Sequence, residues 1–133
     1  MLGEVERQIV NTTDAPRAIG PYSQAVISGN FVFTAGQLGL DPVAGKIVSN
    51  DFEQQVRQII RNLKAILQAA GSDLKNVVKF TVFVTDLDNF GLLNQVFGEY
   101  FPESAPVRSA VQVSRLPLDG LVEIEAIAVR EEQ

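Results

Sequence analysis

The chain has 133 residues, of which 46% are hydrophobic, and its 11 basic and 16 acidic side chains give a net charge of −5. A chain of this length and composition is expected to fold as one domain, residues 1–133, around its own core. The acidic balance argues against nucleic acid as a partner, and no apolar run reaches the roughly 18 residues of a membrane span. Because the first residues are acidic where an export signal would be basic, we expect a cytoplasmic protein.

Neither cysteine nor histidine occurs in the sequence. One chain of this kind cannot form a Ser–His or Cys–His nucleophile pair, use a histidine as general base, or bind a metal through thiolate or imidazole. A metal site made of carboxylates alone stays conceivable, but no Asp-rich calcium loop is present. Arginine, lysine, tyrosine, carboxylates and backbone dipoles remain for chemistry.

The N-terminal third is typical of strands, which we expect at residues 7–10, 25–28 and 31–37, the last two joined by the turn Gly29-Asn30. Pro21 favours a turn, which places the hydroxyl of Tyr22 in a loop beside the sheet. Taken alone, Tyr22 is more often an aromatic that caps the core than a ligand-binding residue. Gly36, at the end of a strand, indicates a close approach of the backbone to another group.

The clearest helix follows a loop over residues 38–48. Asn50 with Glu53 resembles a capping box, and Gly71 lies where a C-terminal cap belongs. One apolar face is traced by Phe52, Val56, Ile59, Ile60, Leu63, Ile66, Leu67 and Ala70. Nothing on this helix indicates chemistry, so we interpret it as scaffold.

A second helix is expected after Leu87, with Asp88 as its cap and Leu87 packed on Leu92. Pro102 ends it. Its buried stripe is expected to contain Phe90, Leu93, Phe97 and Tyr100 or Phe101. Gly91 and Gly98 each cost about 1 kcal/mol relative to Ala inside a helix, so packing must hold the element in place.

Three further strands are expected at residues 76–85, 107–113 and 121–129, the first with Val78, Phe80, Val82 and Val84 facing inward. The element order predicts an α+β fold, with one mixed sheet of about six strands and both helices on one face. The other face must carry Phe83, Ile127 and Val129 besides Lys79, Glu123 and Glu125. A face that is half apolar predicts burial against other copies of the chain.

The last two predicted strands contain charged side chains among apolar neighbours, which requires an explanation. Arg108 is the only charge on residues 107–113, while Glu123 and Glu125 share a face about 7 Å apart. A lone strand charge is more often an edge-strand charge or part of a structural ion pair than a ligand-binding group.

Motifs throughout the chain alter that interpretation. They are Ile19-Gly20-Pro21-Tyr22-Ser23-Gln24-Ala25, Thr34-Ala35-Gly36-Gln37, Asn62-Leu63-Lys64-Ala65-Ile66-Leu67 with Ala69-Ala70-Gly71, Pro106-Val107-Arg108-Ser109, Ser114-Arg115-Leu116-Pro117, and Val122-Glu123-Ile124-Glu125-Ala126-Ile127-Ala128. Together they resemble the RidA/YjgF family of enamine and imine deaminases, over nearly the whole chain.

The resemblance implies a chorismate-mutase-like (YjgF-like) fold assembled as a homotrimer, with clefts between subunits. It implies a 2-iminobutanoate/2-iminopropanoate deaminase, which hydrolyses reactive imines and enamines released by pyridoxal-phosphate dehydratases to 2-oxo acids and ammonia. These species already react with water, so positioning and one acid/base group suffice and no cofactor is expected.

Carried over by motif, the family's site assigns Arg108 to the substrate carboxylate and Glu123 to the water. Tyr22, Phe90 and Asn94 would shape the pocket, and the backbone of Ala35 and Gly36 would line it, with some of these groups from a neighbouring subunit. Two positions depart from relatives: Ala35 where many have serine, and Ala110 where some have cysteine. These departures affect the expected substrate range more than the reaction class.

The geometry leaves one alternative open. If the last two strands formed a simple hairpin turning at Asp119-Gly120, Arg108 would lie opposite about residue 131, far from Glu123. Either the two strands are not neighbours in the sheet, or the site is built in another way.

Family members have also been linked to translation inhibition by RNA cleavage, to chaperone-like binding and to ligand sensing without turnover. The acidic net charge argues against RNA. A sensor would keep Arg108 but could dispense with Glu123, so the presence of both favours hydrolysis.

Overall fold

The computed structural model describes residues 6–131; residues 1–5, which include part of the acidic start used to argue against an export signal, lie outside it. The strands are β1 (Gln8–Val10), β2 (Ala25–Ser28), β3 (Phe31–Thr34), β4 (Val77–Val84), β5 (Val107–Gln112) and β6 (Val122–Val129). The helices are α1 (Phe52–Ala69) and α2 (Phe90–Tyr100), and short 3-10 turns span Leu74–Asn76, Leu87–Asn89 and Pro117–Asp119. Every predicted element is present; β2 matches its predicted bounds, and the other strands differ by one to three residues at one or both ends.

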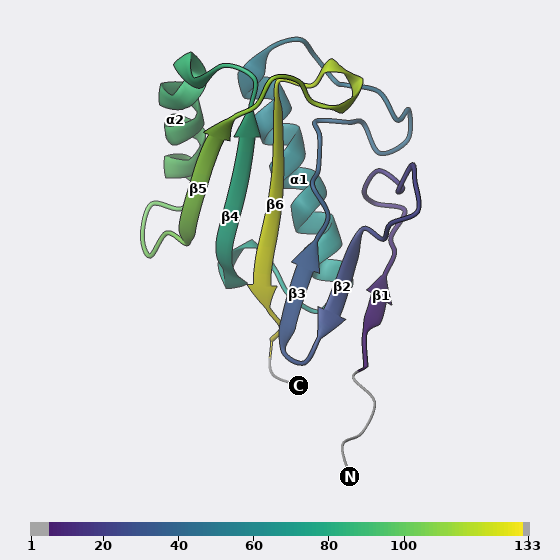
Figure 1. Cartoon of the computed structure of the whole chain (residues 1–133). Coiled ribbons are helices and arrows are strands. Elements are labelled where there is room, and N and C mark those ends of the chain that lie inside the picture. Colours follow the sequence, from purple (N-terminus) through teal and green to yellow (C-terminus); the bar gives the residue numbers. More distant parts are fainter. Residues whose placement is uncertain (1–5, 132–133) are drawn as a thin grey trace.

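One mixed sheet has the strand order β1-β2-β3-β6-β4-β5, and both helices pack on the same side of it (Figure 1). Only the β4–β5 pair is parallel among the described pairs, because α2 carries the chain from one end of β4 back to the start of β5. The α+β prediction is confirmed. Since β4 lies between β5 and β6, the last two strands are not neighbours, and the first of the two alternatives holds.

The core lies between the sheet and α1. The apolar stripe of α1 meets the alternate residues of β4 and β6 that point toward the helices, among them Phe80 and Ile124, which are fully buried. Burial of this kind supplies most of the stability of a helix this short in water. The predicted apolar face of α1 is confirmed.

The cap of α1 is Asp51 and not Asn50. Its carboxylate accepts a hydrogen bond from the backbone N–H of Gln54 at 3.0 Å, so the Asn50–Glu53 capping box is wrong by one residue. At the other end, Gly71 has φ +79° and Ser72 donates its N–H to the carbonyl of Leu67 at 2.8 Å. This hydrogen bond completes a glycine-based helix end as predicted.

The start of α2 also differs from the prediction. Asp86, rather than Asp88, accepts a backbone hydrogen bond at 2.9 Å, because a 3-10 turn precedes the α-helix and contains Asp88 itself. The buried residues of α2 are Leu93, Val96 and Phe97, and Tyr100 and Phe101 pack partly buried against the core, so the predicted stripe is confirmed except at its first residue. Phe90, predicted in the buried stripe, is 41% exposed.

Strand β4 carries a bulge between Val77 and Lys79. The extra residue reverses the alternation at its start, so Val77 is buried and Val78, predicted inward, is 42% exposed. From Phe80 onward the predicted alternation is correct.

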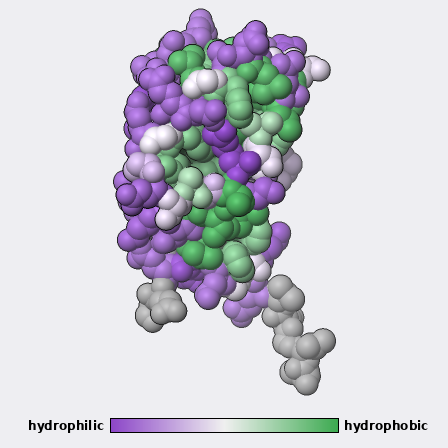
Figure 2. All heavy atoms as spheres, turned by 90° about the vertical axis from the view of Figure 1, so that its left-hand side faces the viewer, coloured by the Kyte–Doolittle hydropathy of each residue, from purple (hydrophilic) through white to green (hydrophobic). Residues whose placement is uncertain are grey.

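The face away from the helices is partly apolar, as the sequence predicts. Its large exposed apolar side chains include Phe31, Phe33, Val107 and Val111, and Phe83, Ile127 and Val129 are half-buried. Seen from the side of α2 and β5, apolar atoms gather in patches separated by a polar band (Figure 2). None of the helices described between residues 6 and 131 combines the length and apolarity that crossing a membrane requires.

Candidate functional site

Arg108 and Glu123 lie on opposite faces of the sheet. Arg108 is registered with Phe80, a fully buried core residue, and therefore points to the helix side. Glu123 is registered with Phe83 and alternates with the buried Val122 and Ile124, so it points to the uncovered side. Within one chain these two side chains do not meet.

On the helix side, α2 holds the guanidinium of Arg108. Its Nη2 donates to Oδ1 of Asn94 at 2.6 Å, and its Cζ lies 5.3 Å from the ring centre of Phe90 and 5.0 Å from that of Phe97. Partial burial lowers the pKa of Arg108 from its ordinary value, although an arginine stays protonated at neutral pH. Of the carboxylates described in residues 6–131, none lies within ion-pair distance of it.

A cavity of about 280 Å³ opens beside this group, between the second half of α2 and the start of β5. Its lining is apolar apart from the guanidinium and consists of Phe97, Gly98, Phe101, Ala105, Pro106 and Arg108. The predicted residues Arg108, Asn94 and Phe90 are thus brought together, with Phe97 as a fourth member that the sequence suggested only as core.

On the uncovered side, Glu123 lines a cavity of about 200 Å³ together with Tyr22 and Gly36. A Cβ on Gly36 would lie 2.7 Å from Oε1 of Glu123, closer than real contacts allow. A larger residue would therefore displace the Glu123 side chain from its present position, which confirms the close approach predicted for Gly36.

The carboxyl group of Glu123 is half-buried and has a raised pKa. Removal from water is the main cause, and the charge of Glu125 on the same strand is the second. A raised pKa brings a carboxylate closer to the range in which it accepts and returns a proton near neutral pH.

Tyr22 is half exposed and does not cap the core. Its hydroxyl accepts a hydrogen bond from the backbone N–H of Ile19 at 3.3 Å, and its ring lies against Gly20, where a Cβ would be 3.2 Å from ring carbon Cε2. The N–H of Ala35 donates to the carbonyl of Gln24 at 2.9 Å, so this backbone donor is already used within the chain.

Arg17, Gln24 and Pro117 also line the Glu123 cavity and were missed as site residues. The buried amide of Gln24 donates to the carbonyl of Pro16 at 2.8 Å, which fastens the preceding loop as one wall. Gln24 and Pro117 fall within recognised motifs, which is the signal that could have found them; Arg17 is an exposed loop residue with no such signal.

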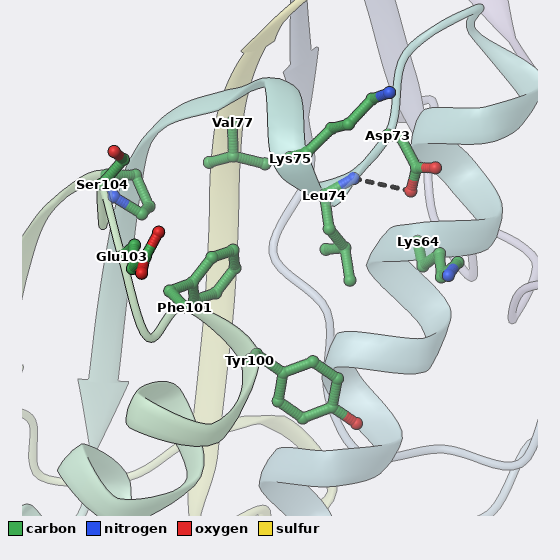
Figure 3. A pocket seen from close by; sticks show the side chains of 10 residues that line it. Lys64, Asp73, Leu74, Lys75, Val77, Tyr100, Phe101, Glu103 and Ser104 are labelled. Carbon is green, nitrogen blue, oxygen red and sulfur yellow. Dashed lines mark hydrogen bonds between the residues drawn. The ribbon is translucent and has the colours of Figure 1, made fainter.

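A third cavity lies elsewhere. It has a volume of about 480 Å³ and opens between α1, the end of α2 and the Leu74–Asn76 turn (Figure 3). Asp73 there accepts the N–H of Leu74 at 2.7 Å and Lys75 pairs with Glu131 at 3.7 Å, so these groups serve the fold. Over residues 6–131, no three acidic side chains gather in a way that could hold a metal ion.

Comparison with known proteins gives concordant matches. Residues 12–130 match the family model described as Endoribonuclease L-PSP. A RutC family protein from Pyrococcus horikoshii is 53% identical over 94% of this chain and 99% of its own length, and the bovine 2-iminobutanoate/2-iminopropanoate deaminase is 46% identical over 97% and 94%. The crystal structure of RidA from Psychrobacter has a TM-score of 0.89 at 48% identity, covering 92% of this chain and 98% of that one.

The fold and the motifs agree with these matches. The chain belongs to the Endoribonuclease L-PSP family, the RidA/YjgF family that its motifs indicate.

Proposed function

We propose that this protein hydrolyses short 2-imino and 2-enamino acids, such as 2-iminobutanoate and 2-iminopropanoate, to 2-oxo acids and ammonia. The observation that carries the proposal is Arg108, a partly buried cation without a carboxylate partner among residues 6–131, beside an apolar cavity. Such a group suits a small organic carboxylate. The deaminase name of a relative 46% identical over nearly the whole chain supports the same substrate class.

Because Arg108 and Glu123 lie on opposite faces, we place the complete site between two copies of the chain. Arg108, Phe90 and Asn94 of one copy would face Glu123, Tyr22 and Gly36 of the next. The partly apolar uncovered face supports association, since a lone monomer would leave it in water. A closed ring is the arrangement that gives every copy both roles, and a homotrimer is the form we propose.

In this cleft Arg108 binds the substrate carboxylate and Glu123 orients a water molecule against C2. An enamine first takes a proton at C3 and loses one from nitrogen to become the imine. Water then adds its oxygen to C2 and passes one proton to Glu123, which returns it to nitrogen and so gives a carbinolamine. The carbinolamine hydroxyl next gives its proton to Glu123, which passes it to the same nitrogen as the C2–N bond breaks. Ammonia leaves, and the C2 oxygen becomes the carbonyl of the 2-oxo acid. One positioned acid/base group typically contributes about 10²- to 10⁴-fold, which suffices for a reaction that proceeds unaided in water.

The test adds purified protein to a dehydratase acting on threonine and follows the imine by trapping it with semicarbazide. Faster imine loss, undiminished by a chelator, is expected. An unchanged rate contradicts the proposed function, and a rate increase that the chelator abolishes contradicts the mechanism without a metal.

RNA cleavage is the second candidate, because the matching family model is described as an endoribonuclease. The net charge of −5 disfavours binding to a polyanion. The test incubates a labelled RNA with the wild-type protein and, separately, with the Glu123→Gln variant. Cleavage by the wild type that the variant loses would support the second function.

A further inference from the structure

The contacts of Arg108 with α2 form one stripe of the helix. Phe90, Asn94 and Phe97 follow the spacing i, i+4, i+7, which puts them on the same face. Seven residues rise about 10.5 Å along a helix. The Cζ atom of Arg108 lies 5.3 Å from one ring centre and 5.0 Å from the other, so the guanidinium contacts both rings at nearly the same distance, with Asn94 as its hydrogen-bond partner.

All three of these contacts are uncharged. The one acidic residue of α2, Glu99, instead binds Arg57 of α1 at 2.9 Å. An aspartate at position 94 would be nearly the same size as Asn94 and would form an ion pair with Arg108. The amide accepts the same hydrogen bond and leaves the positive charge of the guanidinium uncompensated.

Fixing the guanidinium also limits how a ligand approaches. Aromatic rings attract a cation through their faces, so Phe90, Phe97 and Asn94 restrict a ligand to the N–H groups of Arg108 that remain open toward the cavity. A planar carboxylate can accept two parallel hydrogen bonds from the edge of a guanidinium. The ammonium group of a lysine in the same place could not donate this parallel pair.

We propose that Phe90, Asn94 and Phe97 are positioning residues that form a neutral clamp: they fix the guanidinium of Arg108 without neutralising it, and so reserve its charge for a ligand carboxylate. This inference rests on the proposed function for the identity of the ligand, but the clamp is a property of the single chain.

The decisive variant is Asn94→Asp, with Gln95→Glu as matched control because it adds the same charge at the next, exposed position of α2. Binding of 2-oxobutanoate is measured by calorimetry, and KM and kcat with the imine. Asn94→Asp is expected to raise Kd and KM on the order of tenfold, because it pairs with Arg108 and repels the ligand, with a smaller change in kcat. Gln95→Glu should change Kd less than about twofold, since an exposed charge farther away is screened. Equal effects of the two variants, or no effect of Asn94→Asp, would overturn the inference.

Phe90 is exposed enough to be replaced without opening the core, unlike Phe97. Phe90→Leu is expected to raise KM by about two- to fivefold, the usual worth of an exposed cation–aromatic contact, and Phe90→Tyr, which keeps a ring, should recover most of the affinity.

A second readout does not depend on turnover. In ¹⁵N-arginine NMR spectra, the Nε–H signal of Arg108, assigned by its loss in Arg108→Lys, should be shifted by the two rings and should move toward the free-arginine position in Phe90→Leu. If wild type neither binds 2-oxobutanoate nor hydrolyses imine while this shift is present, the proposed function is wrong and the clamp stands. A signal at the free position in wild type overturns the clamp itself.

Discussion

At the scale of single residues, Arg108 combines partial burial with a full charge, which conflict on an ordinary strand. The conflict is resolved by α2, which supplies two aromatic rings and an amide instead of a carboxylate. This arrangement differs from the structural ion pair that a strand charge would ordinarily suggest, because no acidic side chain described in the chain pairs with Arg108.

Replacing Arg108 with Lys keeps the charge but loses the planar fork. We expect kcat/KM to fall about tenfold to a hundredfold or more, since hydrogen bonds to charged groups are worth about 1.5 to 3 kcal/mol. Binding of 2-oxo acids should weaken in parallel. Arg61→Lys, on the exposed side of α1, serves as control. Unchanged activity in Arg108→Lys would mean that Arg108 has a structural role and does not bind the substrate.

The Glu123→Gln variant should affect turnover rather than ligand binding, unlike Arg108→Lys. The amide keeps shape and hydrogen bonding but cannot take a proton, so kcat is expected to drop while 2-oxo acid binding survives or improves slightly. Because burial disfavours the charged carboxylate in the fold, the melting temperature should stay level or rise. A variant that unfolds or dissociates instead would mean that Glu123 is a structural residue.

The pH dependence follows from the raised pKa of Glu123. Only the ionised carboxylate accepts a proton, so turnover should fall as the pH drops through this pKa, above the range of an ordinary glutamate. Glu125→Gln removes the second cause of the shift and should move the midpoint of the acid limb to lower pH. Profiles of kcat against pH for wild type and both Glu variants check this. If the midpoint of the acid limb does not move in Glu125→Gln, the limb reports the titration of a group other than Glu123.

The site residues could be predicted to unequal degrees. The close approach at Gly36 follows from a physical rule about glycine in strands, whereas Glu123 was assigned to the site through the family resemblance, because a charge on an apolar strand taken alone favours a structural role. Phe97 could not be recognised, because an aromatic on the buried stripe of a helix has the same pattern whether or not it also contacts a cation. Arg17 has the pattern of any exposed loop arginine.

At the scale of elements, the long run of apolar residues at helical spacing was sufficient to predict α1. The same pattern did not predict the residues at which the helix begins and ends. Asn50 and Asp51 are both good caps, and only the backbone geometry decides which side chain reaches an open N–H. The bulge in β4 has no sequence signal, since Val77 and Val78 are the same residue type and either can be buried.

The cap of α1 offers a stability test. Asp51→Ala should lower the free energy of unfolding by about 1 kcal/mol, because the N–H of Gln54 loses its acceptor. Asn50→Ala, one residue earlier, should change it by no more than a few tenths. Urea unfolding measures both, and equal losses would mean that the two residues share the cap.

At the scale of the whole molecule, the proposed site requires assembly, because Arg108 and Glu123 lie on opposite faces of the sheet. Light scattering at micromolar concentration should report a trimer. In an equal mixture of Arg108→Lys and Glu123→Gln chains, unfolded and refolded together, about a quarter of the clefts should combine an intact Arg108 with an intact Glu123 if partners are drawn at random. Activity near a quarter of wild type supports a site between copies; activity no higher than the mean of the two variants alone would place the site within one chain.

In the proposed assembly, the placement of Arg108 and Glu123 on opposite faces has a genetic consequence. Two alleles that each damage one side of the sheet would complement each other in the same cell, because some clefts would receive the sound half of each product. Two alleles that damage the same side would not. Mutations in this one gene would thus fall into two complementation groups. The codons of the two groups alternate along the sequence, but the side chains that they encode lie on opposite faces of the sheet.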